Sequence, residues 1–225
     1  MSNSFSYSVD HTNLIKIQTK LNTPPAVRMK ELEGMFYRVQ DFSQSYATLN
    51  EQFFLEFRVA QATFPKSNGA DELHSNLANE LRLHSSGANH FTTYALSPAV
   101  RHFVNDSCRL LEPLTPVLAL KYPNIVPRAT ESLNSYIEKL IASGQPLPFD
   151  AQFVIELYEV WNDYKHRGTN GLHASPWSYD SQEVIKPKLS LPKLKVAPIK
   201  LSDIEIDELT RLVTEKILEL LDFAL

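Results

Sequence analysis

Glycine and cysteine are scarce in this chain of 225 residues. With six glycines, few positions adopt a positive φ without strain, which disfavours β architectures built on many tight turns. The single cysteine, Cys108, excludes an intrachain disulfide and a metal site made of cysteines alone, and predicts a buried structural thiol. No apolar run reaches the ~20 residues that cross a bilayer, and residues 1–10 lack the pattern of a secretory signal. We therefore expect a cytoplasmic protein without membrane contact.

The usual catalytic signatures are also missing. The sequence has no glycine-rich phosphate loop, no Gly-x-Ser-x-Gly elbow and no His-Glu-x-x-His or Cys-x-x-Cys motif, which disfavours nucleotide hydrolysis and serine hydrolase chemistry. One polar cluster comprises Glu80, His84, His90, Arg101 and His102. Glu80 and His84 have the spacing of a metal-binding pair, but no third and fourth ligand accompany them, so we interpret the cluster as surface residues beside a loop. We expect neither a metal nor a cofactor.

What the chain does contain is helical periodicity. Hydrophobic residues make up 43% of the sequence and charged residues 21%, a balance typical of a soluble domain with one core. Apolar residues recur at spacings of three and four, and prolines punctuate them. Helices are predicted over 27–46, 49–64, 70–83, 97–111, 128–141, 149–165 and 202–225, with Ser97 and Pro98 as the N-cap and first residue of the fourth. We predict an all-α bundle of about seven helices, with a loosely ordered segment over 1–26 and the helical domain over 27–181.

The remaining residues divide into a basic arm and an acidic helix. Between Glu183 and Lys200 there are five lysines against one glutamate, and three prolines spaced nearly regularly, so residues 182–201 are predicted to be an edge strand or extended arm. Such an arm packs on the helices, pairs with the acidic helix within one chain or across a dimer, or tracks a phosphate backbone. In residues 202–225, Ser202 and Glu205 form a capping box that opens a helix, which packs on the same domain or on a partner.

The densest group of candidate functional side chains follows the strongly apolar helix over 149–165. Asn162 and His166 are four residues apart and share one face, with Lys165 beside them. A histidine exchanges protons near neutral pH, an asparagine orients it or holds a phosphate, and a lysine or arginine stabilises developing negative charge. Metal-free cleavage of an RNA phosphodiester needs these roles together.

This segment resembles the motif region of the HEPN superfamily, small all-helical domains that usually dimerise and often act as metal-independent ribonucleases in prokaryotic toxin–antitoxin and defence systems. The family pattern is an arginine, commonly followed by a polar residue, then four to six residues, then histidine. In one alignment Asn162 and His166 match, with Trp161 where the arginine is expected; in the other, Arg167 and His173 match. The resemblance implies His166, His173 and Arg167 as catalytic residues, and Asn162, Lys165 and Asn170 as RNA-binding residues, in a homodimer.

The alternative is a function of a different class. Trp161 at the arginine position favours a member that does not cleave RNA. Long aromatic helices and an amphipathic terminal helix are typical of a non-catalytic subunit that docks a protein partner. The sequence therefore predicts either an RNA-binding or RNA-cleaving protein, or a helical interaction subunit.

Overall fold

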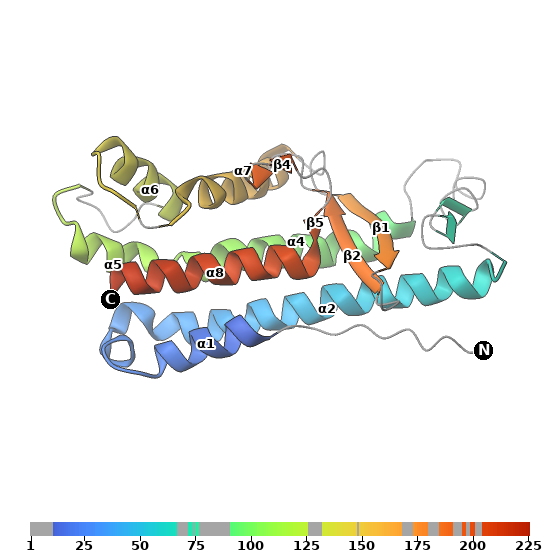
Figure 1. The fold of residues 1–225 in the computed structure, drawn as a ribbon, viewed down its shortest axis with the longest axis horizontal. Coiled ribbons are helices and arrows are strands. Elements are labelled where there is room, and N and C mark those ends of the chain that lie inside the picture. The colour runs from blue at the N-terminus through green and yellow to red at the C-terminus, as the bar shows by residue number, and fades with distance from the viewer. Residues whose placement is uncertain are drawn as a thin grey trace.

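The computed structural model describes residues 11–66, 72–73, 75–76, 91–125, 132–147, 149–167, 173–179, 185–190, 195–196, 199–200 and 204–225. Its α-helices are α1 (Thr12–Leu21), α2 (Glu33–Thr63), α4 (Phe91–Leu111), α5 (Leu114–Lys121), α6 (Leu133–Ala142), α7 (Ala151–Arg167) and α8 (Ile206–Ala224). Figure 1 shows α2, α4 and α8 running along the long axis of the molecule, with short strands crossing toward one end. The expected all-α bundle is confirmed. The helix predicted over 70–83 lies mostly outside the described residues.

The segment predicted to be loosely ordered contains a helix in its described part, and residues 1–10 lie outside the described residues. Residues 12–21 were expected to be loosely ordered, but they form α1, which buries Leu14, Ile17 and Leu21 against α2 and α8. These three positions lie on one face of a helix at spacings of three and four. Two short 3-10 turns, η1 (Ala26–Arg28) and η2 (Lys30–Leu32), then lead into α2. The prediction was wrong because α1 is too short to be stable without the core on which it packs.

Helix α2 replaces two predicted helices with a single one of 31 residues. The sequence between Tyr46 and Leu49 contains neither glycine nor proline, so nothing in it ends a helix. One buried stripe at spacings of three and four runs its full length: Met35, Val39, Phe42, Tyr46, Leu49, Phe53, Phe57 and Ala60. The helix ends before Pro65, as predicted.

Helix α4 begins at Phe91, six residues before the predicted N-cap at Ser97, and Pro98 lies inside it. A proline inside a helix removes one backbone hydrogen bond, so the helix is held by its packing. That packing is against α2, which forms the most extensive contact between elements in the described part of the chain. The ring of Phe42 stacks on that of Phe103 with centroids 5.4 Å apart. The predicted end of this helix at Leu111 is confirmed, whereas α5, which begins at Leu114 and contains Pro116, was not predicted.

Helices α6 and α7 confirm the prediction of two helices separated by a Gly- and Pro-containing segment. The hydroxyl of Ser132 caps α6 by accepting from the backbone N–H of Ser135 at 3.3 Å. Gly144 follows α6 with a φ of 76°, a conformation that glycine adopts without strain. At the start of α7, the carboxylate of Asp150 accepts from the backbone N–H of Gln152 at 3.1 Å.

The Lys-rich arm contributes the middle strand of a sheet, so its prediction as an edge strand was wrong. Strands β1 (His173–Tyr179), β2 (Ile185–Ser190) and β5 (Ile204–Glu205) pair in the order β1-β2-β5, and β3 (Lys195–Val196) pairs with β4 (Ile199–Lys200). A central strand accommodates Pro187 because β1 is irregular between Ser175 and Ser178, opposite this proline. Strand β5 pairs only with the next two residues of β2. The missing N–H therefore falls where the ladder is interrupted.

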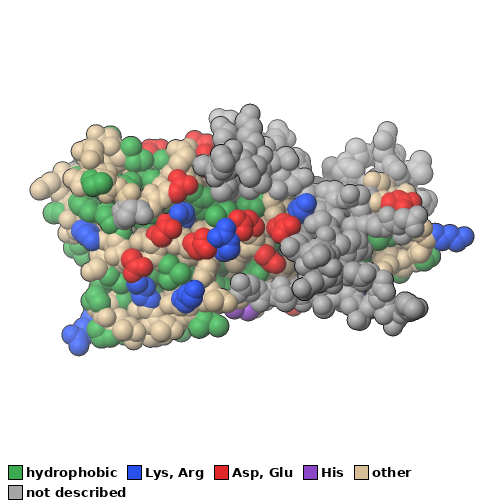
Figure 2. All heavy atoms as spheres, viewed as in Figure 1, with side chains coloured by type: hydrophobic (Ala, Val, Ile, Leu, Met, Phe, Trp, Pro, Cys, Tyr) green, Lys and Arg blue, Asp and Glu red, His purple; other side chains and the backbone are tan. Residues whose placement is uncertain are grey.

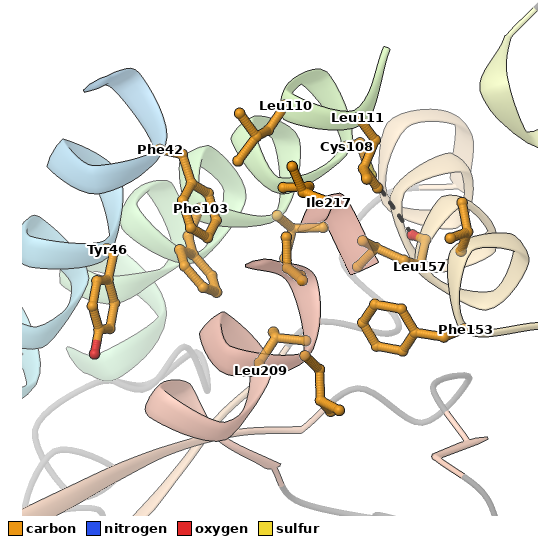
Figure 3. Packing of buried hydrophobic residues seen from close by; sticks show 14 of the residues in the cluster. Phe42, Tyr46, Phe103, Cys108, Leu110, Leu111, Phe153, Leu157, Leu209 and Ile217 are labelled. Carbon is orange, nitrogen blue, oxygen red and sulfur yellow. Dashed lines mark hydrogen bonds between the residues drawn. The ribbon is translucent and has the colours of Figure 1, made fainter. Parts of the chain in front are cut away.

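Helix α8 starts later than the capping box predicts. Its first residue is Ile206, and Glu205 precedes it in an extended conformation without a side-chain cap. Its apolar stripe, which includes Leu209 and Ile217, is buried in the same core as the other helices, so the terminal helix packs on its own domain (Figure 3). Strands β2 and β5 contact α8, so the basic arm and the acidic helix are neighbours within one chain.

Candidate functional site

Helix α7, which carries the predicted site, is held firmly to α4. Leu157 is fully buried, and the phenolic O–H of Tyr158 lies 2.6 Å from Glu112 Oε1 and 3.2 Å from the carbonyl oxygen of Cys108. Burial raises the pKa of Tyr158, so this group stays protonated and donates a hydrogen bond. The thiol of Cys108 faces the carbonyl oxygen of Leu157 at 3.9 Å, and burial raises its pKa as well (Figure 3). The prediction of a buried structural thiol is confirmed.

The predicted site residues lie on two elements. Asn162 and Lys165 are exposed on the last two turns of α7, and His166 and Arg167 are its final residues. His173 is the first residue of β1. For the last three of these residues the structure describes the backbone, and Asn170 lies outside the described residues.

The backbone gives the two alignments of the motif different geometries. Asn162 and His166 belong to one continuous helix at a spacing of one turn, so they share a face of α7. Arg167 and His173 belong to a helix and a strand, so a single helical face does not hold them together. Trp161, at the arginine position of the first alignment, is half-buried and packs against the core. Its role in packing accounts for an aromatic residue there.

One strand of the Lys-rich arm, β3, lies against α7. Strand β1 pairs with β2, which contains Lys186 and Lys188, and β3 contacts α7. In Figure 1, α7 runs from α6 toward the sheet, and β4 lies beside its sheet-side end. Lys195 and Lys200 are direct partners in the β3–β4 register. Like charges opposite each other destabilise a strand pair, and a bound anion relieves that cost.

A second polar region, missed by the sequence analysis, is a groove between α2 and α4 with a volume of about 510 Å³. Helix α2 contributes Asp41, Gln44, Ser45 and Thr48. Helix α4 contributes Ala99, His102, Asn105, Asp106 and Arg109. Ser45 and Ala99 are buried and small, which leaves space between the two helices. The groove was missed because its two stripes lie far apart in the sequence and meet only when the helices pack.

The polar cluster noted in the sequence is not assembled as a site by the described residues. Glu80, His84 and His90 lie outside them, whereas His102 lines the α2–α4 groove. Among the described residues, no three His, Cys, Asp or Glu side chains are close enough to share a metal ion. In the same part of the chain, none of the helices combines the length and apolarity of a membrane span.

The chain was compared with protein-family models, curated proteins and solved structures. No family model, no curated protein and no solved structure matches the chain.

Proposed function

We propose that this protein binds RNA at the carboxyl end of α7, beside the lysine-bearing strands, and cleaves it there without a metal ion. The observation that carries the proposal is the position of the arm: β3 contacts α7, and β2 pairs with the strand that begins at His173. Lys165 on α7 and Lys195 on β3 thereby belong to two elements that are in contact with each other. Lysine and arginine side chains that neutralise phosphates supply most of the affinity of non-specific nucleic-acid binding.

The proposed cleavage assigns one role to each type of side chain. An imidazole accepts the proton of a ribose 2′-hydroxyl, whose oxygen attacks the adjacent phosphorus, and the 5′-oxygen leaves with a proton from an acid. A cationic group stabilises the extra negative charge on the phosphoryl oxygens. In the helical arrangement His166 is the acid/base group, Asn162 orients it, and Lys165 and Arg167 hold the phosphate. In the other arrangement His173 and Arg167 take these roles.

Cleavage of total RNA in the presence of EDTA tests this proposal. We expect the wild-type protein to cleave and Arg167→Ala to lose most activity, because both arrangements use this cation. His166→Ala abolishes cleavage in the helical arrangement, and His173→Ala does so in the other. His102→Ala, which removes an exposed histidine from α4, is the matched control and should cleave normally. Cleavage that survives all three site substitutions removes this site from consideration.

RNA binding is measured in a separate experiment, because a protein that does not cleave RNA can still bind it. Lys165 is exposed at the proposed site, and Lys66 is an exposed lysine just beyond α2. For single-stranded RNA, Lys165→Gln should lower the slope of log affinity against log salt by about 0.7, the value for one lost phosphate contact. Lys66→Gln should leave the slope unchanged. Equal effects of the two substitutions would show that only overall charge matters.

A protein-docking role is the second candidate, and one surface feature favours it. Leu55 and Val59 lie one turn apart on α2 and are 57% and 41% exposed, respectively. They form a small apolar ridge on a helix whose other face is buried. The apolar stripe of α8, in contrast, is used in the core of its own chain. The docking role is favoured if the protein neither binds nor cleaves RNA.

The resemblance to HEPN domains adds two expectations to the proposal, a homodimer and a role in a prokaryotic defence or toxin–antitoxin module. Sedimentation of the purified protein measures its oligomeric state. A dimer is expected, and a monomer at all concentrations would contradict that part of the proposal.

A further inference from the structure

The α2–α4 groove places two carboxylates opposite each other. The two helices are antiparallel, and three contacts define their register: Arg38 Nη1 donates to the carbonyl oxygen of Arg109 at 2.6 Å, and the rings of Phe42 and Tyr46 lie 5.4 and 6.3 Å from that of Phe103. Asp41 is three residues after Arg38 on α2, and Asp106 is three residues before Arg109 on α4, so each lies just under one turn away in the same direction along the groove. These aspartates are therefore level with each other across the groove.

The acidic and basic side chains that line this groove form no ion pairs with one another in the described part of the chain. Asp106 accepts a hydrogen bond from its neighbour Asn105 at 3.1 Å, which leaves its charge in place. Within the described part of the chain, the side chains of Asp41, His102 and Arg109 have no hydrogen bond or ion pair. Asp41 and Asp106 therefore carry charges that no basic side chain of the described residues pairs with.

The spacing of the side chains and the volume of the groove favour an organic cation over a metal ion. Among the described residues the carboxylates and imidazole are too far apart to ligate one metal ion together. A volume of about 510 Å³ instead lies in the range of pockets that hold small organic ligands. A guanidinium or ammonium group on a flexible chain donates several hydrogen bonds, and it binds carboxylates such as those of Asp41 and Asp106.

The same groove offers a site for an anionic group one turn away. Arg109 is three residues beyond Asp106 on α4, so the two side chains are neighbours on the helix surface. Arg38 contacts only the carbonyl oxygen of Arg109, and Arg109 is an exposed residue that lines the groove. We infer that the α2–α4 groove binds a small ligand that carries both a guanidinium or ammonium group and a carboxylate, as a free basic amino acid does. Asp41 and Asp106 hold the cation, and Arg109 holds the carboxylate.

Calorimetric titration of the full chain with three matched probes tests this inference. L-Arginine carries both charges, citrulline replaces the guanidinium by a neutral group of the same shape, and agmatine lacks the carboxylate. We expect saturable binding of arginine and about tenfold weaker binding of each of the other two, since each loses one charge-assisted contact. Equal binding of arginine and citrulline, or no saturable binding of arginine, would overturn the inference.

Substitutions then locate the contacts. Asp41→Asn and Asp106→Asn should each weaken arginine binding about tenfold, and Arg109→Gln should abolish the preference for arginine over agmatine. Glu159→Gln removes an exposed carboxylate from α7 and is the control for overall charge. Circular dichroism confirms that each variant is folded. Weakening by Glu159→Gln as large as that by Asp41→Asn would show that the groove is not the site.

Discussion

Charged side chains on the exposed face of α8 pair with one another, whereas those in the α2–α4 groove face one another unpaired. On α8, the guanidinium of Arg211 lies 2.6 Å from the carboxylate of Glu208 and 2.7 Å from that of Glu215. Lys216 pairs with Glu219 at 2.7 Å, and Figure 2 shows acidic and basic side chains alternating along this face. The difference indicates that the charged side chains of α8 stabilise that helix by pairing within it, while those of the groove can bind a ligand.

The largest change in the free energy of unfolding is expected for a substitution on the buried face of α8. Ile217 is fully buried in the core, so Ile217→Ala removes packed atoms and leaves a cavity. We expect the free energy of unfolding to fall by about 2–5 kcal/mol. Urea denaturation followed by circular dichroism measures it. Leu120→Ala, at a side chain that is 63% exposed, is the control, and a loss of similar size there would contradict the assignment of the core.

A smaller effect is expected where a polar group is both buried and paired. Tyr158→Phe removes the hydroxyl that donates to Glu112 and to the carbonyl oxygen of Cys108. The two acceptors then lose their donor in a partly buried site, and we expect a loss of about 1–3 kcal/mol in the free energy of unfolding. The same urea denaturation measures this loss. A neutral result would mean that water replaces the hydroxyl without cost.

The ion pairs of α8 are expected to contribute less, because they are exposed. Arg211→Gln breaks both pairs of Arg211, whose side chain is 48% exposed, and should cost less than about 1 kcal/mol. The hydrogen bond from Arg211 lowers the pKa of Glu208 below its ordinary value of 4.5. A lowered pKa stabilises the folded state above the ordinary value, and this stabilisation is lost as the pH falls through the lowered pKa.

Thermal unfolding of the wild type and Arg211→Gln at several pH values checks this expectation. The difference in stability between them should be present at neutral pH and shrink as the pH falls below about 4.5. High salt should shrink it as well, because exposed pairs are screened. A difference that persists at low pH and high salt would show that Arg211 stabilises α8 by packing instead.

The smallest effect is expected in the groove. Asp41 is exposed and has no ion pair among the described residues, so Asp41→Asn should change the free energy of unfolding by no more than about 0.5 kcal/mol. Urea denaturation at low salt measures it. A clear destabilisation would show that Asp41 is paired in solution and would remove the contrast between the groove and α8.

Much of the fold could be predicted from the sequence, because apolar residues at spacings of three and four mark a helical face directly. The stripe from Met35 to Ala60 and the buried residues of α7 and α8 were found in this way. Predictions failed where a segment is held by distant contacts. Pro98 indicates a helix start by itself, yet it lies within α4 because α2 packs along that helix. Pro187 indicates an edge strand, yet an irregularity in β1 accommodates it in the middle of a sheet.

The candidate sites divide in the same way. Asn162 and His166 were predicted to share one face, and α7 confirms their spacing because both belong to one helix. That β3 contacts α7 could not be predicted, since two-residue strands carry little sequence signal. The α2–α4 groove was equally inaccessible, because no local pattern links Asp41 to Asp106.

The sequence by itself determined most of the helical segments, though not α1 or α5, and which side of each is apolar, because both depend on residues within a few positions of one another. Only the tertiary structure decided where several helices begin, the order of the strands, and which charges remain unpaired. Those features depend on the register between segments far apart in the chain, and packing of buried side chains such as Phe42 and Phe103 sets that register.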